Sequence, residues 1–174
     1  MVGTHLFCLA SMLANTRILL VLEDYLQMLK QMIEHTPDIL FESTAFVHAL
    51  RPTMAALTLV QTDVVWAALD FIRLILNHNS LEPSPNPPPK FPVYASAISQ
   101  AIEKEGFELL GYILAGLIGE FPEESVPTVV TSIRSLASLW PSQLLAWLPL
   151  ALQGLPAAAV PMQARSQFLV EMNR

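Results

Sequence analysis

The chain has 174 residues and a formal net charge of −6 at neutral pH. Hydrophobic residues make up 53% of it and charged residues only 14%, where about 25% charged residues is usual. The negative charge argues against direct nucleic-acid binding, which needs basic patches that neutralise phosphates, and the single cysteine, Cys8, excludes an internal disulfide.

The high hydrophobic content fits two classes of protein: an integral membrane protein, or part of a helical array whose ends stack on neighbouring helices. A membrane helix needs about 18 or more consecutive apolar residues. Residues 53–76 contain three charged side chains, and residues 107–119 form a shorter stretch that Glu120 closes. We therefore favour the array and keep a small integral membrane protein as an alternative.

A first amphipathic helix is predicted over residues 17–34. Four apolar side chains recur at helical spacing on one side of it: Leu22, Leu26, Leu29 and Ile33. The helix is expected to end near Thr36, because the residue before a proline is pushed out of the α region. A second helix is predicted over residues 43–59, bent at Pro52, where the proline removes one backbone hydrogen bond.

Thr62 and Asp63 form a suitable N-cap pair for a third helix, which is expected to run to about Asn79. Its few polar residues fall on one narrow stripe: Asp63, Asp70, Arg73 and Asn77. A helix of this kind is buried on most of its circumference. An isolated pair of helices could not cover so much apolar surface, whereas an array could.

Residues 79–92 differ in character, because six prolines make them an extended, solvated loop. The spacing of Pro85, Pro88 and Lys90 fits a ligand for an aromatic-grooved domain, although a variable loop between two helices is the favoured interpretation. We therefore divide the chain into helical hairpins over residues 1–78, the loop, and further hairpins of the same domain over residues 93–174.

Beyond the loop, two helices are predicted over residues 93–105 and 107–120, meeting near Gly106. One face of the second helix carries Glu108, Gly111, Tyr112, Ala115 and Gly119, of which the two glycines and the alanine are small. These residues allow another helix to approach closely, or they form a thin solvent-exposed face. A glycine inside a helix costs about 1 kcal/mol relative to alanine, which favours a packing role.

Three more helices are predicted over residues 123–139, 142–154 and from about Pro161 onward. The second of them is interrupted by Pro149. No segment alternates with a period of two, so strands are not expected. The sequence therefore predicts an all-α protein of about seven helices. Helix pairs fill windows of roughly 35–45 residues, the period of HEAT and armadillo repeats, which indicates an α-solenoid of HEAT-like hairpins.

The residues that could support catalysis or metal binding do not form a known pattern. The four histidines show no HExxH spacing, and one cysteine cannot build a thiolate metal site. The chain lacks a GxSxG elbow, a GxxxxGK[ST] phosphate loop and a GxGxxG motif. We therefore expect neither an enzyme nor a cofactor or metal site.

Acidic residues are the candidates for partner binding. Two local clusters and two positions on the third helix could meet a basic protein partner, because clustered charge attracts an oppositely charged partner as it approaches. The first cluster is Glu103, Glu105 and Glu108, the second is Glu120, Glu123 and Glu124, and the positions on the third helix are Asp63 and Asp70. The alternative, which we favour for the two clusters, is that they are solvated turns that keep a hydrophobic array soluble. Some of these acids lie at helix starts, where a negative charge interacts favourably with the helix dipole.

Four runs of the sequence resemble one protein family: residues 25–43, 46–76, 121–156 and 163–172. They are similar to the C-terminal repeats of β-karyopherin nuclear import receptors, in the branch of transportin-SR and the fungal mRNA-transport regulators. The resemblance rests on the order of the helices, the positions of the prolines and the distribution of apolar residues, and it extends from about Leu22 to Met172.

This resemblance implies a fragment of a HEAT-repeat superhelix that shuttles between nucleus and cytoplasm. It would carry protein cargo, such as SR-type or other basic RNA-binding proteins, under the control of the small GTPase Ran. Family members are several times longer, and they contact Ran chiefly through N-terminal repeats that this chain lacks. The arginine-rich helix used for arginine–serine cargo is also absent, because the six arginines are scattered. A generic helical-repeat adaptor is therefore the alternative.

Overall fold

The computed structural model describes residues 2–43, 45–119 and 121–156, together with residues 161, 163, 166 and 167. The elements of these parts of the chain are helices, with no strand among them. The all-α prediction is therefore confirmed. In chain order the elements are α1 (Val2–His35), α2 (Pro37–Phe41), α3 (Ala45–Ala56), α4 (Thr62–Leu76), η1 (Asn79–Leu81), α5 (Phe91–Gly119), η2 (Glu123–Ser125), α6 (Val126–Leu139) and α7 (Pro141–Gly154).

Several helix boundaries lie where proline places them. The chain breaks between His35, the last residue of α1, and Pro37, the first of α2, in agreement with the predicted end at Thr36. Pro52 lies inside α3, which is shorter at both ends than predicted. The predicted N-cap pair of α4 is wrong by one residue, because Gln61 is the cap and Thr62 is already helical.

The prediction of two helices that meet at Gly106 is also wrong. α5 is one continuous helix of 29 residues that passes through this glycine. The missing side chain serves packing, because a Cβ atom at Gly106 would lie 2.6 Å from two ring atoms of Trp147 in α7. Gly106 thus lets α7 approach α5 closely and does not end the helix.

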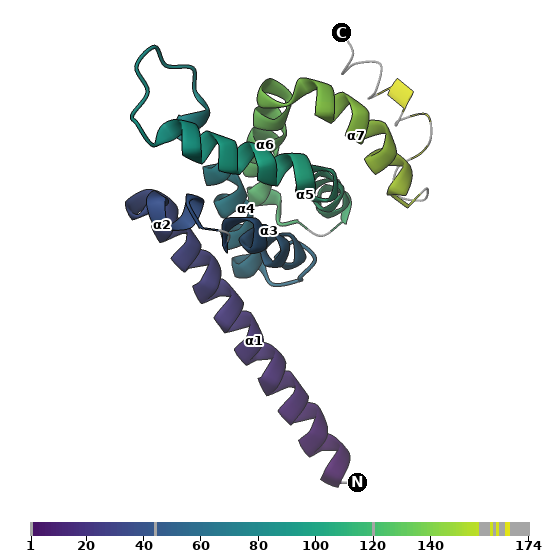
Figure 1. The fold of residues 1–174 in the computed structure, drawn as a ribbon. Helices are drawn as coiled ribbons and strands as arrows, with labels where there is room; N and C mark the ends of the chain where they lie inside the picture. Colours follow the sequence, from purple (N-terminus) through teal and green to yellow (C-terminus); the bar gives the residue numbers. More distant parts are fainter. Residues whose placement is uncertain are drawn as a thin grey trace.

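The helices form two layers (Figure 1). One layer contains α1, α4 and α6, with α4 packed between the other two. The second contains α3, α5 and α7, with α5 in the middle. Consecutive helices such as α3 and α4, or α6 and α7, connect the layers. Each of these six helices therefore packs most extensively on a neighbouring helix of its own layer.

The core lies between the layers and is centred on α4. Nine of the fifteen residues of α4 are buried, including Phe71 and Leu69. Asp63 and Asn77 are exposed, while Asp70 and Arg73 are partly exposed, so the predicted polar stripe is confirmed. In the part of the chain that the structure describes, no helix is both long and apolar enough to span a membrane.

The packing at Gly106 gives a stability prediction with an internal control. Gly106→Ala forces a methyl group against the Trp147 ring, and overpacking of this kind costs about 1–3 kcal/mol. A Cβ atom at Gly111, in the same helix, meets nothing within 4 Å beyond its own helix. Gly111→Ala therefore gains helix propensity, up to about 1 kcal/mol, with no steric clash to offset it.

We expect chemical denaturation to show a lower free energy of unfolding for Gly106→Ala and a higher one for Gly111→Ala. Equal or greater stability of Gly106→Ala would contradict the packing role assigned to this glycine.

Candidate protein-interaction surface

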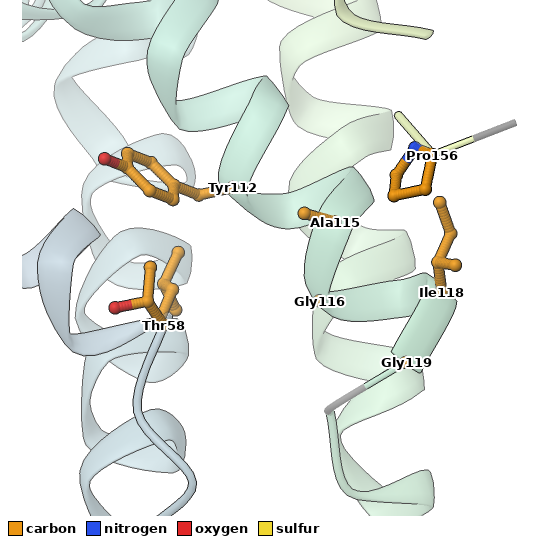
Figure 2. Close-up of a pocket in the computed structure, with 8 residues that line it drawn as sticks. Thr58, Tyr112, Ala115, Gly116, Ile118, Gly119 and Pro156 are labelled. Atoms are coloured by element: carbon orange, nitrogen blue, oxygen red, sulfur yellow. The ribbon is translucent and has the colours of Figure 1, made fainter. Parts of the chain in front are cut away.

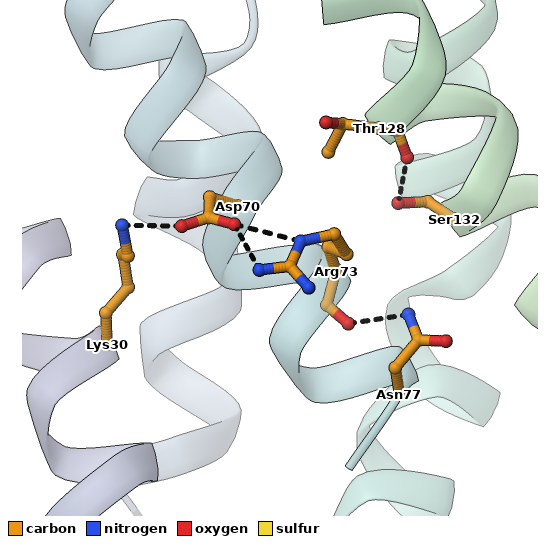
Figure 3. Close-up of polar contacts among 6 residues, drawn as sticks. All are labelled: Lys30, Asp70, Arg73, Asn77, Thr128 and Ser132. Atoms are coloured by element: carbon orange, nitrogen blue, oxygen red, sulfur yellow. Dashed lines mark hydrogen bonds and ion pairs between the residues drawn. The ribbon is translucent and has the colours of Figure 1, made fainter.

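The exposed edge of α4 carries an ion-pair network that joins two helices (Figure 3). Lys30 of α1 lies 2.6 Å from one carboxylate oxygen of Asp70, and Arg73 donates to the other oxygen from Nε (2.9 Å) and Nη2 (2.6 Å). Partial burial by itself raises the pKa of Asp70, but the bonds from Lys30 and Arg73 outweigh it and hold that pKa below its ordinary value.

The same edge is linked to α6 by neutral hydrogen bonds. The Asn77 amide donates to the backbone oxygen of Arg73 (2.8 Å), and the Ser135 hydroxyl of α6 donates to the Asn77 side-chain oxygen (2.9 Å). The stripe predicted from sequence is thus a polar seam across α1, α4 and α6. Asp70 is already paired within the fold, so its negative charge is largely compensated before any partner arrives.

Glu105, another candidate for partner binding, is buried. Only 3% of the residue is exposed, and its Oε1 atom accepts a hydrogen bond from Nε of Arg51 in α3 at 3.2 Å. Lys104 lies 3.9 Å from the same oxygen. Glu105 therefore ties α5 to α3 and presents almost nothing to a partner, because α3 covers the face of α5 from which it projects.

The remaining candidates differ in what they offer. Glu103 and Glu108 are exposed on α5, and Glu123 and Glu124 are exposed in η2. No ion pair engages these four within the described residues. Glu120 lies outside the described residues. The acids that can meet a partner are therefore on α5 and in η2, whereas Asp63 stands alone at the exposed start of α4.

A hollow of about 300 Å³ runs beside the second half of α5 (Figure 2). The turn after α3 bounds it on one side with Leu57 and Thr58, and Pro156 bounds it beyond Ile118. Its α5 wall is mostly small and apolar: Tyr112, Ala115, Gly116, Ile118 and Gly119. At Gly111 and Gly119, the face of small residues predicted from sequence has no neighbouring helix packed on it. A Cβ atom at either position would meet nothing within 4 Å beyond its own helix.

A second hollow, of about 270 Å³, adjoins the first at Tyr112. Arg51 and Met54 of α3 line it together with Glu108 of α5. We call the two hollows together the α3/α5 groove. It is apolar toward Pro156 and carries a carboxylate at Glu108, a combination suited to a peptide segment with apolar side chains and one basic residue.

Sequence reasoning missed the α3 side of this groove. Met54 and Leu57 look like ordinary core positions of an amphipathic helix, and both are in fact buried. Nothing in the spacing of α3 indicates that it faces α5, because the two segments are some 50 residues apart in the chain. Only Glu108 and the small residues of α5 gave a local signal.

Comparison with protein families and with curated proteins does not identify this surface. A scan against protein-family models found no match, and a search of curated proteins found none either. Within the described part of the chain, no three His, Cys, Asp or Glu residues gather closely enough to hold a metal ion.

The network at Asp70 predicts a pH-dependent loss of stability. Because the folded pKa of Asp70 is depressed, its contribution is complete above the unfolded pKa of about 3.9 and is lost as the pH falls through the folded value. We expect Asp70→Asn to lower the free energy of unfolding by about 1 kcal/mol at pH 7.

The difference between Asp70→Asn and the unchanged chain should shrink below about pH 4. Urea denaturation over a pH series measures it. Glu103→Gln removes one charge from an exposed site and is the matched control, for which we expect a change within about 0.5 kcal/mol. A pH-independent effect at Asp70 would contradict the ion-pair account.

Proposed function

We propose that this chain is a protein-binding scaffold, built as part of an α-solenoid of HEAT-like hairpins. The observation that carries the proposal is the packing of each helix on the next helix of its own layer. In helical-repeat proteins each repeat contacts only its neighbours, which gives an extended surface that can flex and enclose a partner. The hairpins α3–α4 and α5–α6 are the repeat units of this proposal.

The α3/α5 groove is the proposed binding surface. It lies between the first helices of two successive hairpins, where a flexing array would change its width. Its apolar stretch accommodates apolar side chains of a partner, and Glu108 attracts a basic one. Glu103 lies on the same helix and adds to the negative potential along α5.

The resemblance of the sequence to β-karyopherins gives this scaffold a specific role in the proposal. The chain would form C-terminal repeats of a nuclear transport receptor of the transportin-SR type, without enzymatic activity of its own, and would shuttle between nucleus and cytoplasm with basic protein cargo. Ran-GTP would act through repeats outside these 174 residues. The scattered arginines favour the second candidate, a helical-repeat adaptor with no transport role.

A titration with an arginine–serine-rich peptide tests the proposal. We expect saturable binding that weakens as salt rises from about 50 to 150 mM, because exposed charges are screened. Ran-GTP should not change the affinity of this chain alone. Ala115→Trp, which fills the groove, should weaken binding at least about tenfold. The matched control is Ala146→Trp, at an exposed position of α7 away from the groove.

The outcomes separate the candidates. Binding that Ala115→Trp abolishes and Ala146→Trp preserves supports both the scaffold and its groove. Binding unaffected by Ala115→Trp would contradict the groove as the contact surface. An absence of binding to the peptide would contradict the transport role and leave the adaptor as the better proposal.

A further inference from the structure

The proline-rich loop between η1 and α5 stands clear of the helices (Figure 1). Every residue from 82 to 90 is exposed. The prolines of this loop therefore add nothing to the core, although six of the chain's fourteen prolines lie between residues 79 and 92. A loop of this composition is available to a partner along its whole length.

The prolines also restrict the backbone of the loop, which bends at Pro85 and Asn86 and turns at Pro89 and Lys90. Each proline fixes its own φ near −65°, and each residue before a proline is disfavoured in the α region. Residues 82, 84, 86, 87 and 88 all precede a proline. Polyproline II has three residues per turn, so Pro85 and Pro88 would fall on one edge of such a helix, with Lys90 two residues later. A partner that reads this edge must therefore straighten the bend at Pro85 and open the turn before Phe91.

Both ends of the loop are anchored to the body of the protein. At the start, the Ser80 amide donates to Nδ1 of His78 (3.2 Å), and the His78 ring packs edge-on against Phe41 with 5.0 Å between centroids. At the end, Nζ of Lys90 pairs with Asp38 and, at 3.1 Å, with Glu42. The base of the loop is thereby fixed, although every residue from 82 to 90 stays exposed.

The ion pairs hold Lys90 away from the extended edge. A turn closes from the Phe91 amide to the Pro88 oxygen at 2.9 Å and directs the lysine toward the two carboxylates at α2. The bonds from Asp38 and then Glu42 raise the pKa of Lys90, so the lysine keeps its charge. A partner that needs this cation must replace both carboxylates with its own.

We propose that residues 85–90 dock an SH3-type domain, with Pro85 and Pro88 in its aromatic groove and Lys90 in its acidic pocket. Domains of this class recognise PxxP segments in the polyproline II conformation. Two structural observations carry the proposal beyond the variable loop that the sequence alone favoured. The whole motif is exposed, and its cation already sits between two carboxylates, the same chemistry that an acidic pocket offers. Asp38 and Glu42 compete with the partner for Lys90 and so lower the affinity of the chain for it.

A calorimetric titration of the full chain with a recombinant SH3 domain selected for PxxPx(Lys/Arg) ligands tests this proposal. Pro85→Ala with Pro88→Ala should weaken binding at least about tenfold, and Lys90→Ala by about tenfold. Pro83→Ala lies outside the motif and should leave the affinity within about twofold. Glu42→Gln removes one competing carboxylate and should tighten binding about two- to fivefold.

A synthetic peptide of residues 81–93 completes the test, because its lysine has no competing carboxylates. We expect the peptide to bind at least as tightly as the full chain. Binding of the peptide without binding of the chain would overturn the proposal, since the loop would then be inaccessible in the folded protein. Binding of neither, or binding that survives the double proline substitution, would also overturn it. Circular dichroism of each variant establishes that the helices are intact.

Discussion

The need to cover α4 shapes this structure. Apolar side chains surround this helix on all but one stripe, and nine of its fifteen residues are buried. α1 and α6 cover it within its own layer, and α3 covers it from the other. The polar seam of Asp70, Arg73 and Asn77 occupies the one remaining edge and joins α4 to both neighbours of its layer. Burial sets the arrangement of the helices, and the seam adds polar contacts between α4 and its two neighbours.

The second layer depends on close approach at α5. Trp147 packs against both hydrophobic clusters of the protein, and it fits only because Gly106 has no side chain. Gly116 likewise leaves room for an aromatic ring, because a Cβ atom there would lie 2.2 Å from two ring atoms of Phe121. Gly111 and Gly119 have no such neighbour, and the α3/α5 groove remains open beside Gly119. One helix thus uses the same kind of residue in two ways: to admit an aromatic ring on one face and to leave space on another.

The packing of the helices decides which charged side chains are paired and which are exposed. The sequence groups acids by proximity along the chain, but the fold separates them by environment. Glu105 ties α5 to α3 through Arg51, whereas its near neighbour Glu108 lines the groove. Lys90 and the carboxylates at α2 fix the end of an exposed loop. Among the acids predicted to meet a partner, the exposed ones therefore lie on α5, in η2 and at the start of α4.

The sequence by itself determined the helical class, the breaks at Thr36 and the proline-rich loop, and the exposed stripe of α4. All of these follow from the 3.6-residue period and from backbone restrictions that act over a few residues. Only the tertiary structure decided that α5 continues through Gly106, because the reason is Trp147, which lies in another helix. It likewise decided that Glu105 is buried against Arg51 and that α3 lines the groove, since contacts between residues about 50 positions apart leave no local pattern.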